Sequence, residues 1–421
     1  MKTHYLSILL LLMSSVAIGQ IRSNTPLSRF GYGEIDDKNY AIGDAMNGAV
    51  TALRTTDGLN FANPAALTAL DSMTFIFELG LSAKAYTFSE NGTSANAFNS
   101  GLDYIAFAFP IAKFWRTGGG LSPFSNKGYA FQTFKYGADT LQTNIQATGG
   151  INQVYWSNGF LIAKGLSVGV NAYYLWGQTE RFSTALLQNR DPQNPIGTFS
   201  NKAQKLDICQ TKGFIYSLGA QYQFDISDQK SVIAGATFTP AQKLTYNESK
   251  TVSTVLVPRD TIRTENLKTD MPMSIALGAS YQKKDNYLIS ADIEMTKWSG
   301  LSIYGLENNF DDYLRLSVGG EWLPEKYSMN FFKRIKYRGG LKFERLQWVS
   351  LDANNAKVNY SNLSLSAGFG LPFKQSRNTV HISAEIGKHF ASSSEALTDQ
   401  YLLLKVNITL FDKWFHKRKI D

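Results

Sequence analysis

The sequence has little of what disulfide-rich, helical-membrane and multidomain proteins need. Its 421 residues include one cysteine, Cys209, and only 18% charged residues. One cysteine excludes an internal disulfide framework. Beyond the first twenty residues no run of 18 or more apolar residues occurs, which excludes a membrane-spanning helix. Linkers rich in Pro or Ser, charge blocks and low-complexity tracts are also missing, so nothing marks a boundary between soluble domains.

Patterns that carry catalytic or metal chemistry are missing as well. There is no HExxH, GxSxG, CxxC or EF-hand pattern, and Gly118-Gly119-Gly120 lacks the lysine of a phosphate loop. His381 and Glu385 share one face of a predicted strand, but four residues at about 3.3 Å each separate them by roughly 13 Å. We therefore expect no catalytic residue, no metal and no cofactor, with a lumenal hydrolase as the remote alternative. The net charge of +8 is spread along the chain, which argues against a nucleic-acid partner.

The first twenty residues are typical of a secretory signal. Lys2 and His4 precede an apolar run over 5–13, and the small residues Ala17 and Gly19 stand where a signal peptidase reads. This run is too short to span a bilayer. We therefore expect residues 1–19 to be removed and the mature protein to leave the cytoplasm; the strand pattern described next predicts that it resides in the cell outer membrane.

Period-two alternation of apolar and polar residues is the main positive signal. Aromatic residues make up 13% of the chain and there are 34 glycines. Successive side chains of a strand point to opposite faces, so each alternating segment has one apolar and one polar face. About 14 such segments can be counted: 73–84, 105–111, 129–136, 154–163, 166–176, 214–224, 232–238, 273–281, 287–296, 314–322, 335–344, 363–371, 380–386 and 402–410.

The connections between these segments alternate between short and long. Long ones are expected at 89–100, 137–153, 178–208, 248–270, 299–312, 347–359 and 391–398. Outer-membrane barrels combine short periplasmic turns with longer outer loops. The sequence therefore predicts an all-β fold in which residues 72–411 form a transmembrane antiparallel β-barrel of about 14 strands. A soluble sandwich or propeller also alternates, but it does not place aromatic residues so often near strand ends.

The predicted inward faces carry charges of both signs. Mixed signs on facing strands indicate ion pairs inside the lumen and argue against an open pore that selects ions of one sign. The residues are Glu78, Lys84, Asp292, Glu294, Arg315, Glu321, Lys336, Arg338, Lys342, Glu344 and Glu385.

The chain before and after the barrel has a different character. Residues 20–71 are rich in small side chains, and Asn63-Pro64 indicates a turn that opens a short helix over 65–70. We expect this segment to be a hatch, or plug, packed inside the barrel, with a loosely attached leader as the alternative. Residues 412–421 form a basic tail on the periplasmic side, either solvated or close to acidic partners.

Several motifs resemble the FadL-type outer-membrane transport proteins. Ser28-Arg29-Phe30-Gly31-Tyr32-Gly33, Ala45-Met46-Asn47-Gly48-Ala49 and Asn63-Pro64-Ala65-Ala66-Leu67 are similar to the amino-terminal hatch of that family. Residues 149–156 and 167–174 resemble the interior of a divergent branch, as does the ending 412–419. The Asn-Pro-Ala segment is the most specific of these.

The resemblance implies passive uptake of hydrophobic molecules such as long-chain fatty acids. It also implies a sideways exit through a gap made by a kink in the third strand. Gly118, Gly119, Gly120 and Pro123 lie in the third predicted strand, where proline cannot donate a ladder hydrogen bond and glycine weakens pairing. The alternative is a bulge that only curves the wall.

An apolar ligand needs an apolar pocket, and we assign candidate lining residues to the hatch and to the long connection 178–208. The alternative is that these residues only pack the plug. A second hypothesis is a docking or assembly barrel for secretion or envelope machinery, with no transport role. The expected partners are membrane lipids, lipopolysaccharide, a hydrophobic ligand and, under the second hypothesis, an envelope protein. The candidate ligand-binding residues are Leu59, Phe61, Asn63, Pro64, Leu67, Phe182, Leu186 and Leu187.

Overall fold

A computed structural model describes residues 25–414, except 38, 91, 137–139, 189–198, 255–258, 306–309, 352–355, 374–375 and 394–395. The predicted signal segment 1–19 and the tail beyond residue 414 lie outside the described residues. No helix among the described residues is long and apolar enough to cross a membrane.

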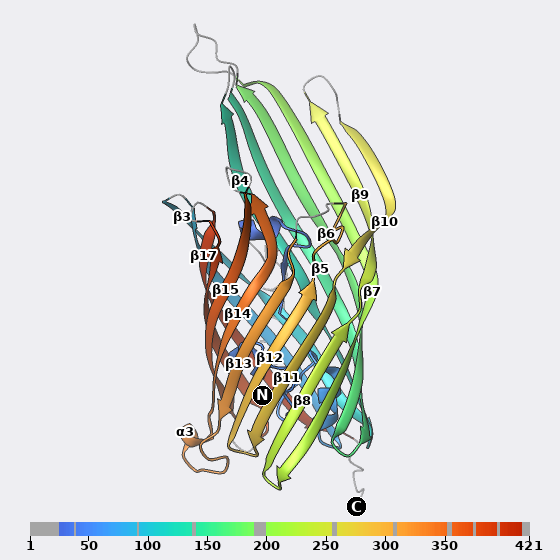
Figure 1. Ribbon diagram of the computed structural model, residues 1–421, viewed down its shortest axis with the longest axis vertical. Coiled ribbons are helices and arrows are strands. Elements are labelled where there is room, and N and C mark those ends of the chain that lie inside the picture. The colour runs from blue at the N-terminus through green and yellow to red at the C-terminus, as the bar shows by residue number, and fades with distance from the viewer. Residues whose placement is uncertain are drawn as a thin grey trace, which may run out of the picture.

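The chain forms a closed antiparallel barrel of 14 strands, as predicted (Figure 1). Neighbours in sequence pair with one another, and the last strand pairs with the first, so that Tyr401 lies opposite Tyr86. Two of the wall strands are each interrupted by a proline, Pro240 and Pro272, which cannot donate to the ladder. The labelled elements are β2 (Thr74–Glu90), β3 (Thr93–Ala112), β4 (Trp115–Tyr136), β5 (Thr140–Ala163), β6 (Leu166–Gln188), β7 (Phe199–Ser227), β8 (Lys230–Thr239), β9 (Gln242–Thr254), β10 (Asp260–Met271), β11 (Met273–Lys283), β12 (Tyr287–Lys297), β13 (Tyr313–Trp322), β14 (Lys336–Leu351), β15 (Lys357–Pro372), β16 (Thr379–Ala391) and β17 (Thr398–Lys413).

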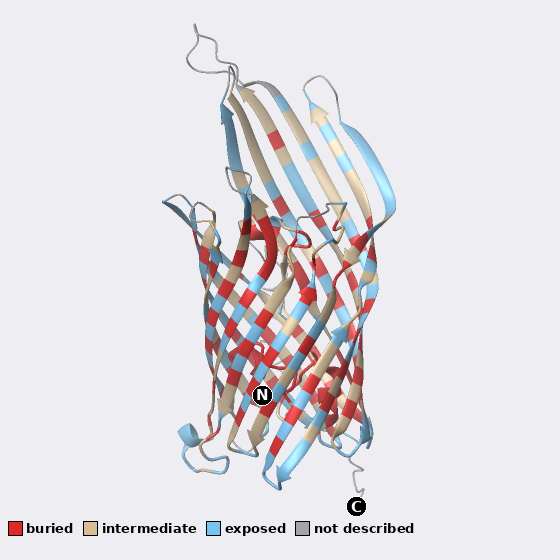
Figure 2. Cartoon of the chain, in the orientation of Figure 1, coloured by how far each residue is buried: buried red, intermediate tan, exposed pale blue. Residues whose placement is uncertain are grey.

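Burial along the strands is inverted relative to a soluble protein. In β12, Ser290 and Asp292 are buried whereas Ile289 and Ile293 are exposed. The same alternation of buried and exposed residues covers the lower part of the barrel in Figure 2. Apolar side chains on the outside and polar ones within are the arrangement expected of a barrel in lipid.

Strand length varies strongly around the barrel. β4, β5, β6 and β7 contain 22 to 29 residues, whereas β12 and β13 contain 11 and 10. About 9–11 residues suffice to cross a membrane. The long strands therefore continue well beyond the short ones and stand above the rest of the barrel (Figure 1). We call this part the wall extension; it comprises residues 127–136, 140–150, 177–188 and 199–212 together with β9 and β10.

The wall extension corrects three of the predicted long loops. β6 continues to Gln188 and β7 begins at Phe199, so most of the expected connection 178–208 is strand. The expected connections 137–153 and 248–270 are also largely strand, because β5 begins at Thr140 and β9 and β10 pair with each other. Polar residues and the pair Gly149-Gly150 in these stretches are typical of loops, and they obscure strands that the ladder pairing shows.

The N-terminal segment, residues 25–70, lies inside the barrel. It contains η1 (Pro26–Arg29), β1 (Glu34–Ile35), α2 (Ile42–Ala45) and η2 (Pro64–Ala69). The last is the short helix predicted after Asn63, here of 3-10 type, and the Asn63 side chain caps it by accepting from the Ala65 N–H at 3.1 Å.

Aromatic side chains form the core between this segment and the wall. The ring of Tyr40 lies 4.2 Å from Tyr104 and 5.7 Å from Phe61, and Phe61 lies 4.9 Å from Tyr155, measured between centroids. Edge-to-face pairs of this kind contribute about 0.5–1.5 kcal/mol each beyond their burial. The core therefore joins segment and barrel.

Replacing Gly340 with valine should destabilise the protein, whereas the same change at its neighbour Gly339 should not. A Cβ at Gly340 would lie 2.5 Å from the carbonyl carbon of Met46 in the N-terminal segment, but at Gly339 it would meet only an oxygen at 3.5 Å. Overpacking costs about 1–3 kcal/mol. Urea unfolding in lipid vesicles measures the difference, and equal unfolding midpoints for the two variants would contradict the packing described above.

Candidate functional site

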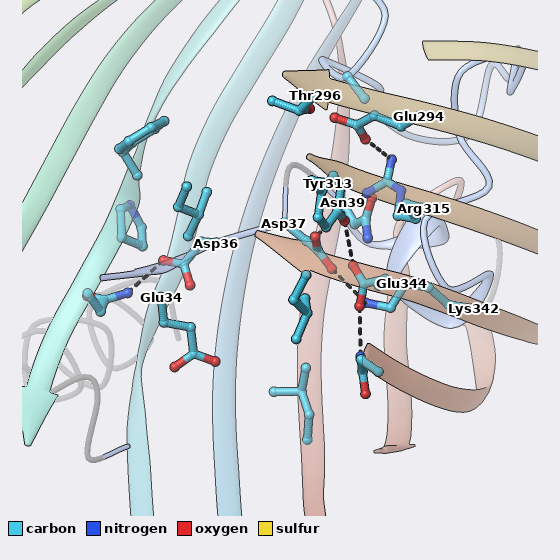
Figure 3. A pocket seen from close by; sticks show the side chains of 18 of the residues that line it. Glu34, Asp36, Asp37, Asn39, Glu294, Thr296, Tyr313, Arg315, Lys342 and Glu344 are labelled. Atoms are coloured by element: carbon cyan, nitrogen blue, oxygen red, sulfur yellow. Dashed lines mark hydrogen bonds and ion pairs between the residues drawn. The ribbon is translucent and has the colours of Figure 1, made fainter. Parts of the chain in front are cut away.

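A cavity of about 340 Å³ lies inside the barrel, between the N-terminal segment and the wall. Figure 3 shows Asp37 of the segment pointing toward Arg315 and Lys342 of the wall. The lining is rich in charge, with more acids than bases, which does not suit an apolar ligand. The acids are Glu34, Asp36, Asp37, Asp44, Asp103, Glu294, Glu344 and Glu385, and the basic side chains are Lys84, Arg315, Lys342, Lys405 and His389.

Asp37 of the segment meets two cations of the wall. Its carboxylate lies 3.0 Å from the Lys342 ammonium and 3.7 Å from the Arg315 guanidinium. Burial alone would raise the pKa of Asp37, but the two cations outweigh burial and hold that pKa below its ordinary value. Asp37 therefore stays ionised and fixes the segment to β13 and β14.

Three more acids of the segment pair with bases of the barrel. Glu34 lies 2.7 Å from Lys84 on β2, and Asp44 lies 2.9 Å from Lys405 on β17. Asp57 lies 2.5 Å from Lys336 on β14. We refer to these contacts, with those of Asp37, as the four acid–base clamps. In each clamp the acid belongs to the segment and the base belongs to the barrel.

The Asp44 clamp is the most deeply buried. Asn407 also donates to Asp44, at 3.1 Å, and Lys405 contacts Asp103 at 2.8 Å. Burial raises the pKa of Asp44 to about 7, although Lys405 opposes this rise. The contact with Lys405 therefore stabilises the ionised form of Asp44.

Backbone groups of the segment are also held by wall side chains. Asp292 accepts hydrogen bonds from the N–H groups of Val50 and Thr51 at 2.7 and 2.6 Å. Glu78 accepts from the Leu59 N–H at 3.0 Å, and Arg116 donates to the Leu70 carbonyl at 3.0 Å. These contacts satisfy backbone groups that would otherwise be buried without partners.

The candidate ligand residues of the N-terminal segment lie in packing contacts. Leu59, Phe61 and Leu67 belong to the aromatic core and do not line the cavity. Asn63 is buried with its amide donating to the Thr51 carbonyl at 2.8 Å, and Pro64 begins η2. The contacts of these five residues favour the packing alternative.

Phe182, Leu186 and Leu187 lie on β6 in the wall extension, apart from the segment residues. Phe182 and Leu186 pair across β5 with Gln146 and Gln142, and Leu187 with Leu141, so the first two share a face that Leu187 does not. The structure does not bring the two halves of the predicted ligand site together.

The glycine and proline cluster does fall in the third barrel strand, β4. Gly118, Gly119 and Gly120 are in the part of β4 that pairs with β3, and this ladder ends at Leu121. Beyond it the register of β4 against β5 shifts between Pro123 and Ser125. At that point β1 of the N-terminal segment pairs with β4, with Ile35 opposite Ser125 and Glu34 opposite Asn126.

The inward-facing histidines and Glu385 are held in pairs with wall side chains. His381 lies 2.7 Å from an Arg338 nitrogen and 3.1 Å from the Thr409 hydroxyl. His389 lies 2.7 Å from Asp399, and Glu385 accepts from Tyr401 at 2.8 Å. Within the described part of the chain no group of three or more metal-ligating side chains occurs.

Sequence reasoning predicted the inward charges of the wall and lumenal ion pairs that brace the wall and the plug, but it did not identify the acids of the segment. The wall bases Lys84, Lys336 and Lys342 were expected to form lumenal ion pairs, which the structure confirms. A signal for the partners was present, because acids predominate over residues 34–57. Alternation cannot reveal them, since the segment has no strand period.

Comparison with solved structures gives the fold. The Pseudomonas putida toluene transporter TodX matches with a TM-score of 0.59 at 14% identity, over 91% of this chain and 100% of that one. A Pseudomonas aeruginosa FadL homologue matches at 0.58 and 12%, over 90% and 99%. The Ralstonia pickettii toluene transporter TbuX matches at 0.55 and 16%, over 89% and 98%. The FadL-type fold suggested by the sequence is thereby confirmed.

Comparison by sequence gives a family. A family model described as BamG matches residues 1–421, the whole chain. No curated protein matches the chain in sequence.

Replacing Lys405 with methionine should cost about 3–5 kcal/mol of unfolding free energy, because it leaves buried carboxylates without their cation. Lys250→Met is the matched control, since Lys250 pairs with Glu248 at 2.7 Å on the exposed wall extension, and such pairs contribute less than about 1 kcal/mol. Urea unfolding in vesicles at pH 8 measures both.

Acidification should reduce the loss in Lys405→Met. As the pH falls from 8 to 5, Asp44, with its raised pKa, takes up a proton and the uncompensated charge disappears. A loss that is independent of pH, or equal in the two variants, would argue against the clamp.

Proposed function

The chain belongs to the BamG family. We propose that it is an outer-membrane barrel whose lumen is filled by its N-terminal segment, and that the barrel docks a partner protein on its wall extension. The observation that carries the proposal is the length of β4–β7, which continue far past what a membrane requires. Membrane lipids and lipopolysaccharide would contact the apolar belt below the extension.

The state of the lumen supports docking more than conduction. The N-terminal segment is held by four acid–base clamps along one arc of the barrel, from β13 and β14 to β17 and β2. Removing one partner of a buried ion pair costs about 3–5 kcal/mol. Displacing the whole segment would break all four clamps, and the space that remains is charged rather than apolar.

The edge of the wall extension offers a site for a partner. Among the described residues, β4 beyond Gly128 pairs with β5 on one side only. A free strand edge presents unpaired N–H and C=O groups and readily accepts an added strand. Exposed Phe134 and Tyr136 stack near this edge, with centroids 6.1 Å apart. The partner that fits is a protein that adds an extended segment and covers these rings.

A photo-crosslinking amino acid at Phe134 should give one discrete protein adduct in intact outer membranes. The same probe at Phe343, on the exposed outer face of β14, is the matched control and should give lipid adducts only. The measurement is the mass of the adduct on a denaturing gel. Lipid adducts alone at both positions, with normal amounts of folded barrel, would contradict docking at this edge.

Uptake of hydrophobic small molecules is the second candidate, because one observation favours it. The β3–β4 ladder ends at Leu121, and a cavity of only about 10 Å³ lies at that place, lined by Tyr104, Ser122 and Gln153 and by acids of the segment and of β3. The solved structures of similar fold include proteins described as toluene transporters. A route for a fatty-acid-like molecule would run past Pro123, with the hatch beside it and a lateral exit into the bilayer.

Uptake of a labelled fatty acid by cells distinguishes the second candidate. Pro123→Val should restore ladder hydrogen bonding near the gap and lower uptake several-fold if the lateral route operates. Pro110→Val is the control, because Pro110 lies in the paired part of β3 opposite Arg116. Equal uptake by both variants and the unmodified protein would exclude this route.

A further inference from the structure

The connection between β13 and β14 is unlike the other described turns at its end of the barrel. It spans Leu323 to Ile335 and contains α3 (Phe331–Arg334), whereas β5 and β6 are joined there by Lys164 and Gly165 alone. Figure 1 shows α3 beside the foot of the barrel, at the end opposite the wall extension. Short turns mark the periplasmic end of such barrels. We call residues 323–335 the α3 turn.

The α3 turn is held in one conformation by its own hydrogen bonds. The Glu325 N–H donates to the Lys333 carbonyl at 2.9 Å, which closes the turn on itself. The Asn330 side chain caps α3 by accepting from the Phe332 N–H at 3.0 Å. The Leu323 N–H donates to the Asn286 carbonyl at 2.6 Å and ties the turn to the β11–β12 connection.

This ordered turn presents large apolar side chains outward. Met329 is 99% exposed, Tyr327 84% and Phe332 69%, and Phe331 is exposed as well. Four such side chains within six residues form a contiguous apolar surface, which in soluble surroundings marks an interaction site.

The same apolar surface continues into a row of aromatic residues on the barrel exterior. Strand register places Tyr287 opposite Trp322, Trp322 opposite Tyr337, and Tyr337 opposite Phe369. Aromatic rows of this kind lie at the membrane interface. The Tyr337 hydroxyl donates to the Phe332 carbonyl at 3.1 Å, so α3 is joined to the row directly.

Basic side chains surround the apolar ones. The pair of Lys326 with Asp285 and that of Lys333 with Glu325 are both solvent-exposed and therefore weak. Their ammonium groups are free to exchange partners with phosphate groups of a bilayer surface. Over this turn and the adjoining one, basic residues outnumber Asp285 and Glu325; they are Lys283, Lys284, Lys326, Lys333 and Arg334.

We propose that the α3 turn is an interfacial anchor that inserts into the phospholipid surface of the periplasmic leaflet. Phe331, Phe332 and Met329 enter the boundary between headgroups and acyl chains, and the lysines meet the phosphates. Continuity with the aromatic row favours lipid over a protein partner, because the row already lies at that boundary. The anchor would fix the height and rotation of the barrel in the membrane beneath the wall extension.

Fluorescence from a single label tests the insertion. In a Cys209→Ser background, which removes the only native thiol, Phe332→Cys carries an environment-sensitive fluorophore. The protein is reconstituted in vesicles of phosphatidylethanolamine and phosphatidylglycerol with or without brominated acyl chains. We expect a blue-shifted emission and at least threefold stronger quenching by brominated lipid than for a label at Asp228→Cys, which lies in the exposed β7–β8 turn at the same end.

A label at Phe369→Cys, within the aromatic row, calibrates the quenching expected at the interface. Emission and quenching at residue 332 equal to those at residue 228 would overturn the proposal. A label at residue 332 that is water-exposed in vesicles but shielded in native outer membranes would also overturn it and assign the turn to a protein partner. Folding of the Phe332→Cys variant is checked separately on a denaturing gel, on which a folded barrel remains folded when the sample is not heated.

Discussion

The structure depends on one constraint: the acidic side chains that the N-terminal segment carries into the lumen must meet cations of the wall. An isolated buried charge costs several kcal/mol, so a segment that carries Glu34, Asp37, Asp44 and Asp57 into the lumen is stable only where bases await each acid. Those bases lie on one arc of the barrel, which runs from β13 to β17 and β2. On the other side, Asn171 and Gln221 donate hydrogen bonds to backbone carbonyls of the segment, and the aromatic core fills the space between.

The same constraint orders the outside of the molecule. In strands that bury Asp292 or Lys342 inside the lumen, the apolar residues lie on the outer face. Such a face is stable against lipid but not against water. Apolar residues such as Ile289 face lipid, and the aromatic row through Trp322 and Tyr337 marks where lipid ends. Above the membrane this requirement ceases, and the wall extension accordingly carries a mixed, largely polar surface on both faces.

The barrel could be predicted because alternation is a local property of the sequence. Each of the 14 alternating segments overlaps a wall strand, and the inward charges such as Lys342 face the lumen. The wall extension was predicted only in part: segment 129–136 was included, but the polar residues Gln142, Asn144 and Gln146 and the pair Gly149-Gly150 made 137–153 resemble a loop. The clamps were missed for a different reason: Asp44 and Lys405 are 361 residues apart, and only the closed fold brings them together.

The gap between β3 and β4 adjoins the clamped segment. This contact distinguishes the two candidate functions. β1 lies along β4 directly after the ladder with β3 ends, and its residue Glu34 is itself clamped to Lys84 and Tyr86. Widening the gap by moving β1 would therefore break a clamp. A transporter would have to break this clamp each time a ligand passes. Otherwise β1 stays in place and the ligand has to pass between Tyr104 and Pro123. A docking barrel meets no such cost, because a rigid segment that braces the base of the long strands is what a fixed docking surface requires.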